Sequence, residues 1–241
     1  MPIIRDCVLD LFSQRGGASP GLVTAYDKSR WHHDVALHNV TWVRNYDGGM
    51  WLPVFNGTTA YMDAAHADTE AMGITNDLNS GYTIMGWINW TDTTQSEIIA
   101  GRYELDVGGW ELYLTENAGV YYLTQRHHHA GTVIDTHPRT ATNSTGWANS
   151  ITAFFTVVYP GTGLDCLHYR NGVPLAVTSS TGGVLDFEAT TRDLVVGIRF
   201  TKDANWYEGT MGGLRMYNYI WTPAQIRARY HAEKYLVGGP S

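Results

Sequence analysis

Two acidic residues near the middle of the chain are the first candidates for chemistry. Glu104 and Asp106 are one residue apart, so on a β-strand both carboxylates would point to the same face. Retaining hydrolysis of a glycosidic bond needs two such groups about 5–5.5 Å apart, one as nucleophile and one as acid. Further along, Gly108 and Gly109 carry no carboxylate, and Glu111 is out of register for a plain strand. We therefore predict no catalytic residue, and interpret the two acids as polar residues on a solvated strand or turn.

A run of three histidines is the second candidate. On a strand, His127 and His129 would point the same way, so their imidazoles could share a metal ion with His137 as a third ligand. Neither a cysteine nor a closely spaced carboxylate completes such a set. Adjacent histidines are also common in polar loops. The metal site therefore stays open, and the pattern favours a solvated stretch at the end of a hairpin.

Several aromatic residues lie beside Gly, Asn, Asp or His in expected loops, and these are Trp31, Trp51, Trp147, Trp206 and Tyr207. Sugar rings have C–H faces that stack on aromatic rings, and loops at one end of a rigid sandwich are a usual place for a binding site. We predict a ligand-binding site that includes Trp31, Trp206 and Tyr207 together with His127 and His129. For each ring the alternative is a loop anchor that packs on the edge of the core.

The charge balance excludes some partners. The 241 residues include 16 Lys and Arg and 23 Asp and Glu, which gives a net charge of −7. A nucleic-acid surface needs clustered basic residues, so nucleic acid is not expected as a partner. No apolar run approaches the roughly 18 residues of a membrane span. The first residues show no basic region followed by an apolar stretch, so neither a membrane segment nor a secretory signal is expected.

Two cysteines, Cys7 and Cys166, lie in strand-like runs. Two buried thiols are the simpler interpretation, since a single pair cannot form a disulfide framework. One disulfide bond between them stays open.

The pattern of residues 82–90 is typical of a central strand. Ile84 and Trp90 face one way, while Met85 and Trp87 face the other, so apolar side chains lie on both faces. Such a strand needs cover from both sides.

Other strands alternate or pair through short turns. Residues 109–115 alternate cleanly, with Trp110 facing one way and Glu111 the other, and residues 120–124 follow as the second half of a hairpin. Asn171-Gly172 is the strongest two-residue turn signal and predicts a second hairpin over residues 167–177. Further strands are expected at 151–159, 193–199 and 209–217.

One helix is predicted near the C-terminus. Thr222 is its N-cap, Pro223 occupies the first helical position, and Gln225 completes a capping box. Trp221 and Ile226 occupy the positions of a hydrophobic staple. The helix is expected to run for about four turns, to the Gly-Gly-Pro run, as a lid on a sandwich. We therefore predict an all-β fold, a two-sheet antiparallel jelly-roll β-sandwich with one short C-terminal helix, formed by residues 1–241 as a single domain.

Four stretches, in this order, resemble the laminin-G-like and pentraxin-like branch of the concanavalin A-like lectin/glucanase superfamily. They are residues 54–62, 82–88, the hairpin at 167–172, and 208–218 with the helix that follows. Each encodes strands and turns, so the set implies the jelly-roll fold more specifically than it implies a function. The glucanases of the superfamily carry Glu-x-Asp and a further glutamate on one strand, a pattern that Glu104 and Asp106 match only in part.

The resemblance also implies a cofactor. In relatives a carboxylate near the closing strand often helps to hold a calcium ion. At the positions where that strand carries paired aspartates in relatives, this chain has Gly212 and Gly213. Calcium therefore stays open, and no other cofactor is expected.

We expect a non-catalytic recognition module that binds carbohydrate or another surface ligand, such as a protein surface, through loop aromatics. The alternative is a structural or decoration protein of a virus particle or other assembly, acting as a homo-oligomer, because similar stand-alone domains are encoded among bacteriophage structural genes. A glycoside hydrolase is disfavoured by the missing glutamate. The cellular location stays open, with a virion as one setting.

Overall fold

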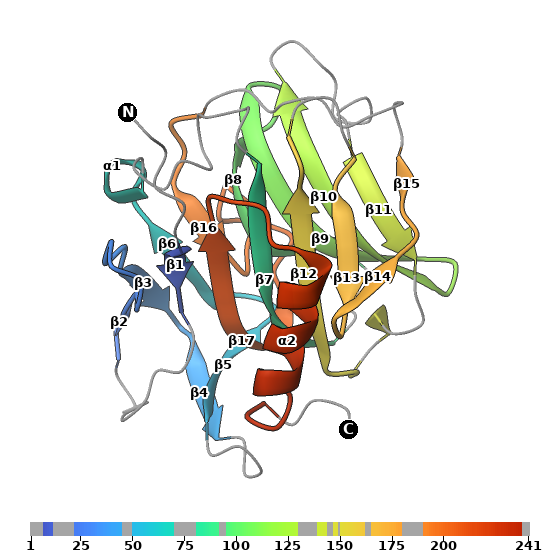
Figure 1. The fold of residues 1–241 in the computed structure, drawn as a ribbon. Helices are drawn as coiled ribbons and strands as arrows, with labels where there is room; N and C mark the ends of the chain where they lie inside the picture. The colour runs from blue at the N-terminus through green and yellow to red at the C-terminus, as the bar shows by residue number, and fades with distance from the viewer. Residues whose placement is uncertain are drawn as a thin grey trace.

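The computed structural model describes residues 7–11, 22–44, 50–69, 81–91, 95–129, 139–143, 147–148, 150–161, 165–179 and 190–237. They form two antiparallel sheets, a four-residue helix and one longer helix near the C-terminus (Figure 1). The strands are β1 (Cys7–Asp10), β2 (Thr24–Ala25), β3 (Val35–His38), β4 (Thr41–Arg44), β5 (Trp51–Asn56), β6 (Tyr61–Ala64), β7 (Tyr82–Trp90), β8 (Glu97–Glu104), β9 (Gly108–Asn117), β10 (Val120–His129), β11 (Arg139–Asn143), β12 (Ala153–Tyr159), β13 (Leu167–Arg170), β14 (Val173–Leu175), β15 (Thr178–Ser179), β16 (Leu194–Val196) and β17 (Glu208–Tyr217). The helices are α1 (His66–Thr69) and α2 (Pro223–Glu233).

The two sheets interleave strands from distant parts of the chain. The first sheet has the order β14-β13-β12-β7-β17-β5-β4, with β1 paired to β17 outside this path. The second has the order β15-β11-β10-β9-β8-β16-β6-β3-β2. This arrangement confirms the predicted two-sheet antiparallel jelly roll with one short C-terminal helix. No helix within the described ranges is long and apolar enough to cross a membrane.

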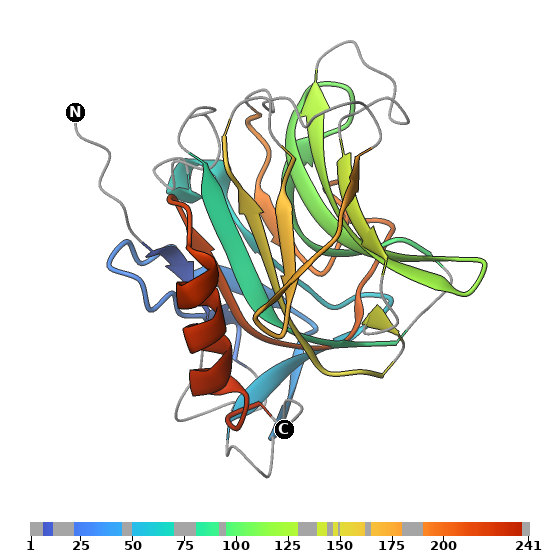
Figure 2. The ribbon, with the colours of Figure 1, turned by 45° about the vertical axis from the view of Figure 1, so that its right-hand side comes forward.

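Strand β7 contributes to two separate apolar cores, as its pattern predicts. Ile84 and Trp90 belong to the core between the sheets, whereas Met85 and Trp87 belong to a second core on the other face. Helix α2 covers that second face with Ile226 and other apolar residues (Figure 2). The expectation of a central strand covered on both sides is confirmed.

Both predicted hairpins form. Asn171 and Gly172 connect β13 to β14 with φ values of 52° and 77°, which is the left-handed backbone that a type I′ turn requires. The side-chain oxygen of Asn171 also accepts a hydrogen bond from the backbone N–H of Phe154 at 2.9 Å. In the other hairpin, β9 and β10 extend beyond the expected residues and pair from Val120 opposite Asn117 onwards.

Helix α2 begins as its sequence predicts. The Thr222 hydroxyl accepts from the backbone N–H of Gln225 at 3.3 Å, and the Gln225 side chain accepts from the backbone N–H of Thr222 at 2.8 Å. The helix ends at Glu233 after 11 residues, earlier than the expected four turns. The reason is that the chain leaves the helix and buries Val237 in the core beneath α2.

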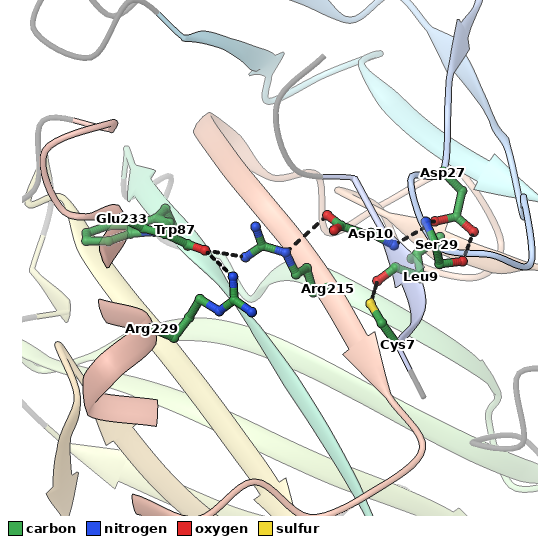
Figure 3. Close-up of polar contacts among 9 residues, drawn as sticks. All are labelled: Cys7, Leu9, Asp10, Asp27, Ser29, Trp87, Arg215, Arg229 and Glu233. Atoms are coloured by element: carbon green, nitrogen blue, oxygen red, sulfur yellow. Dashed lines mark hydrogen bonds and ion pairs between the residues drawn. The ribbon is translucent and has the colours of Figure 1, made fainter. Parts of the chain in front are cut away.

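A buried network of charges connects α2 to β17 and, through Arg215, to β1 (Figure 3). Arg215 on β17 lies with its Nη1 2.9 Å from a carboxylate oxygen of Glu233 and donates from Nε to Asp10 on β1 at 3.1 Å. Glu233 also accepts from Arg229 at 3.2 Å and from the Trp87 indole at 3.3 Å. The side chains of Arg215 and Glu233 are each only 4% exposed, so each charge is shielded from water and is balanced by the other.

The open question of a disulfide bond is resolved. Neither Cys7 nor Cys166 forms one. Cys166 is buried in the core between the sheets, whereas Cys7 packs against the core beneath α2. Burial, and then the charge of Asp10, raise the pKa of the Cys7 thiol to about 12, so it stays protonated at neutral pH.

We predict that Glu233→Ala strongly destabilises the fold. The change leaves the buried Arg215 guanidinium and the Trp87 indole without an acceptor that they share, and breaking a buried ion pair costs about 3–5 kcal/mol. Urea unfolding should show this loss. Arg227→Ala, on the exposed face of the same helix, should change the free energy of unfolding by no more than about 0.5 kcal/mol. Equal effects of the two variants would contradict the role given to the network.

A second prediction concerns acid. Burial lowers the pKa of His168 on β13 from 6.5 to about 3. Below pH 6.5 the unfolded chain therefore gains a proton that the folded protein does not accept, and the fold loses up to about 1.4 kcal/mol per pH unit between pH 6.5 and 3.

The imidazole Nδ1 of His168 lies 2.8 Å from the hydroxyl of Thr142, so Asn can replace that part of the ring. Unfolding of His168→Asn between pH 7 and 4 should show a shallower loss of stability than the wild type. The exposed His231, changed to Asn, serves as the control and should leave the slope unchanged. Parallel curves for all three proteins would overturn the assignment.

Candidate functional site

Trp31 is a half-buried loop residue. Its ring packs against the core between the sheets and lies parallel to the His33 ring, with centroids 6.4 Å apart. The guanidinium of Arg30 covers it at 4.8 Å. This placement is that of a loop anchor, and Trp31 as a whole is only half-buried.

Trp206 lies on the outer face of the second sheet and is also half-buried. Its ring meets Tyr61 edge-on at 6.0 Å, and Tyr61 stacks on His38 at 4.1 Å. Lys202 lies 5.9 Å from the centre of the Tyr61 ring. Trp206 therefore belongs to a partly exposed aromatic cluster and stays a candidate for ligand contact.

Tyr207 does not fit the prediction of an exposed ring. It is 0% exposed and packs edge-on against Phe55 at 5.6 Å, in the core between the sheets. Its hydroxyl donates to the carbonyl of Thr210 at 3.0 Å. The physical reason is alternation in the extended segment before β17, where Trp206 faces outwards and its neighbour faces inwards. Trp147 is likewise buried.

The histidine run is not a solvated stretch. His127 is 0% exposed and its Nε2 lies 2.8 Å from the Tyr82 hydroxyl in the core. His128 points to the opposite face and is equally buried. The side chain of His129, and His137, lie outside the described residues. Within the described ranges no group of three or more His, Cys, Asp or Glu could hold a metal ion.

Glu104 and Asp106 do not share a strand face. Glu104 is the last residue of β8 and forms an ion pair with Arg192, while Asp106 lies in the following turn with φ 58°. The chain turns directly after Glu104, so the alternation that would align the two carboxylates ends there. Their interpretation as polar residues at a solvated strand end and turn is confirmed.

The residues at Gly212 and Gly213 do not fit a calcium ion. Gly213 lines a small hollow whose other lining residues are apolar, among them Trp42, Pro53 and Met211. Calcium requires six to eight oxygen ligands, several of them carboxylates. These residues therefore supply no calcium site.

The outer face of the second sheet carries a row of polar residues that sequence reasoning did not assemble. Glu111 on β9 lies opposite Gly101 on β8 and opposite Arg126 on β10. The neighbours of Glu111 along β9, Trp110 and Leu112, face the core. The alternation of residues 109–115 therefore predicted the outward direction of Glu111 correctly, but not its partners.

Glu111 is a buried carboxylate held by three groups. Arg126 Nη1 lies 3.0 Å and His128 Nε2 3.1 Å from the same Glu111 oxygen, and Tyr103 contributes a further hydrogen bond. Burial alone raises the pKa of Glu111, but these hydrogen bonds and the charges of His128 and Arg126 outweigh it and lower the pKa. Glu111 is therefore ionised at neutral pH and its charge is met inside the protein. Arg126 also donates to the Tyr113 hydroxyl at 2.7 Å.

A glycine makes this arrangement possible. Tyr103 and His128 stack with ring centres 4.7 Å apart and planes 13° from parallel, across Gly109, which pairs with both. Gly109 has φ 93°, and a Cβ there would lie 2.0 Å from the Arg102 carbonyl oxygen. Only glycine fits this position.

Two adjoining hollows open over this row and together form a groove. The first, of about 230 Å³, is lined by Ser96, Ile98, Tyr103, Leu105, Glu111, Tyr113, Arg126, Arg199 and Asn205. The second, of about 500 Å³, is lined by Ser96, Tyr113, Thr115, Glu116, Asn117, Tyr122, Thr124, Arg126, Ala141, Thr178 and Ser179. Both hollows include Ser96, Tyr113 and Arg126. The groove thus presents hydroxyl, amide and guanidinium groups from strands of the second sheet and from the loop at Arg199 and Asn205.

Solved structures with a similar fold are binding domains of bacterial toxins. The binding domain of botulinum neurotoxin serotype G superposes with a TM-score of 0.69 at 13% identity, over 95% of this chain and 51% of that one. A botulinum neurotoxin DC binding domain in complex with SialylT gives 0.65 at 11% identity, over 94% and 51%. The binding domain of Paraclostridial Mosquitocidal Protein 1 gives 0.65 at 13%, over 94% and 52%. The chain spans about half the length of each of them. At these identities the likeness is one of fold.

A comparison with curated protein sequences finds no match. Residues 56–227, well over half of the chain, match the family model described as the concanavalin A-like lectin/glucanases superfamily. The matched residues include β9 and β10, which carry the groove, and the start of α2. The chain belongs to the concanavalin A-like lectin/glucanase superfamily.

Proposed function

We propose that the protein is a non-catalytic recognition module that binds carbohydrate in the groove on the outer face of its second sheet. The observation that carries this proposal is the groove itself, with a buried Glu111–Arg126 pair beneath two adjoining polar hollows. Sugars present many hydroxyl groups, and the groove offers donors and acceptors along its length from Asn205 to Thr178.

The supports of the groove are rigid. Its floor consists of β8, β9 and β10, whose backbones pair continuously except at one bulge near Ile98. Arg126 lies over the Tyr113 ring at 5.0 Å, and its position is set further by the ion pair with Glu111. Side chains fixed in this way lose little conformational entropy on binding, which favours recognition of a polar ligand.

The similar solved structures agree with a binding role. One is a botulinum toxin binding domain in complex with SialylT, one concerns an interaction of botulinum neurotoxin type C with two ganglioside molecules, and one is a complex with rat synaptotagmin II. This chain matches only about half of each toxin domain, so those ligands assign no position here. They support binding of glycans or protein surfaces as the class of function.

Hydrolysis is disfavoured by the state of the carboxylates. A general acid needs a raised pKa, whereas the pKa of Glu111 is lowered. The other carboxylate of the groove, Glu116, lies five residues further along β9, roughly 17 Å away at about 3.4 Å per residue, and accepts from the backbone N–H of Gly119 in the hairpin turn. Retaining and inverting glycosidases both need their pair within about 9.5 Å.

The partly exposed cluster of Trp206, Tyr61 and His38 is a second candidate position for the same function. Its rings could stack on a sugar, as the sequence suggests, but no hollow among those described includes them. The experiment below distinguishes the two positions.

We predict that blocking the groove abolishes glycan binding without unfolding the protein. Thr178 is exposed on β15 and lines the second hollow, so Thr178→Trp should fill it and weaken binding of any glycan found on an array by about tenfold or more. Thr41→Trp, at an exposed position of β4 in the other sheet, is the matched control. Melting curves of both should match the wild type.

The outcome also locates the site. If Trp206→Ala removes binding and Thr178→Trp does not, the aromatic cluster is the site and the groove is not. If no glycan binds and the protein forms a stable oligomer through these faces, the proposal fails in favour of a structural role.

A further prediction is that the protein releases no reducing sugar from β-glucans. Glu104→Ala and Asp106→Ala should leave this result unchanged, because neither side chain faces a second carboxylate across a shared strand face. Reducing-end assays on long incubations provide the measurement. Turnover by the wild type that disappears in Glu111→Gln would refute the non-catalytic assignment.

A further inference from the structure

The first hollow of the groove has an uneven charge. Its charged lining residues are Glu111, Arg126 and Arg199. Glu111 and Arg126 form an ion pair with side chains 5% and 11% exposed. Among the described residues Arg199 forms no ion pair, and it is half-buried at the edge of the hollow. One positive charge is therefore left over in this hollow, in a protein whose net charge is −7.

The loop that carries Arg199 is held in place. The Arg199 N–H donates to the Ala204 carbonyl at 3.2 Å, and the Lys202 N–H donates to the Arg199 carbonyl at 2.9 Å. Asn205 ties the loop to the strand beside it, since its amide donates to the Ser96 carbonyl at 2.8 Å. The Arg199 guanidinium lies over the Phe200 ring at 5.6 Å. The cation is thus positioned before any ligand binds.

Arg126 supplies an independent sign of a ligand. It is 9% exposed, it lines both hollows, and its Nε is buried without a hydrogen-bond partner among the described residues. Its two terminal nitrogens donate to Glu111 and Tyr113. A buried donor without an acceptor is unfavourable, and an acceptor group entering the hollow would satisfy it.

The acid at the other end of the groove does not cancel this charge. Glu116 lines only the second hollow and lies roughly 17 Å from Glu111 along β9. That distance exceeds the Debye length of about 8 Å at physiological ionic strength. The groove therefore has a positive end and an acidic end.

We infer that the first hollow selects glycans that carry an anionic group, a carboxylate or a sulfate, and that Arg199 is the residue that determines this specificity. This inference rests on the proposed carbohydrate-binding function of the groove. Arg199 would form charge-assisted hydrogen bonds to the anion, while Asn205 and the neutral groups of the second hollow contact the rest of the saccharide.

The experiment uses a glycan array with neutral, carboxylated and sulfated members, followed by calorimetric titration. The titrated pairs are 3′-sialyllactose against lactose, trigalacturonate against its methyl ester, and a sulfated against an unsulfated disaccharide. In each pair only the acidic group or acidic sugar differs. For the pair whose acidic member resembles the array hit, we expect the acidic member to bind at least tenfold more tightly than the neutral one. Added salt should reduce this difference in affinity.

Variants separate the residue from the net charge. Arg199→Gln should lower the affinity for acidic glycans by about tenfold or more and leave the affinity for neutral glycans unchanged. Arg199→Lys should restore part of the lost affinity. Arg227→Gln removes the same charge from an exposed position on α2 and should have no effect. Carboxylated or sulfated hits show which anion is preferred.

Two results would overturn the inference. Neutral glycans that bind as tightly as acidic ones, with Thr178→Trp still blocking them, would refute anion selectivity and leave the proposed function standing. Acidic glycans whose affinity survives Arg199→Gln would refute the role of Arg199. An array without any hit would remove the proposed function and this inference together.

Discussion

Strand β7 is buried on both faces, so apolar side chains must pack against it from two sides. Ile84 and Trp90 bind the first sheet to the second, and Met85 and Trp87 leave an apolar outer face that must be covered. Helix α2 supplies that cover, and the Glu233–Arg215 pair fixes its last turn on β17. This packing covers the outer face of the first sheet around β7, and the described hollows with polar linings lie on the second sheet.

The second sheet uses buried charge in a different way. One oxygen of Glu111 lies within hydrogen-bond distance of both Arg126 and His128 across β9 and β10, and Tyr103 stacks on His128. Buried ion pairs contribute little net stability, because desolvation offsets much of their attraction. Their value here is orientation: a fixed guanidinium below an open groove is suited to recognition, and a carboxylate held ionised is unsuited to act as an acid.

Membership of the concanavalin A-like superfamily gives the fold of this protein but does not identify its binding residues. The family model and the toxin binding domains share its layers, yet identities of 11–13% over about half of each toxin domain carry no binding residue across. Function in such folds resides in side chains placed on a common scaffold. In the function proposed for this chain, those side chains are the outward residues of β8 to β10 and the loop at Arg199 and Asn205.

Elements whose signals are local could be predicted from the sequence alone. The alternation of residues 109–115, the Asn171-Gly172 turn and the capping box at Thr222 each depend on neighbours a few residues away, and each appears as predicted. Extending the hairpin by its own register would also have placed Arg126 opposite Glu111. Tertiary packing buries Tyr207 and leaves Trp206 half-buried, and it brings Arg199 and Arg126 to the lining of one hollow. Exposure and charge pairing depend on segments that meet only after folding, and local periodicity carries no information about which distant segment covers a side chain.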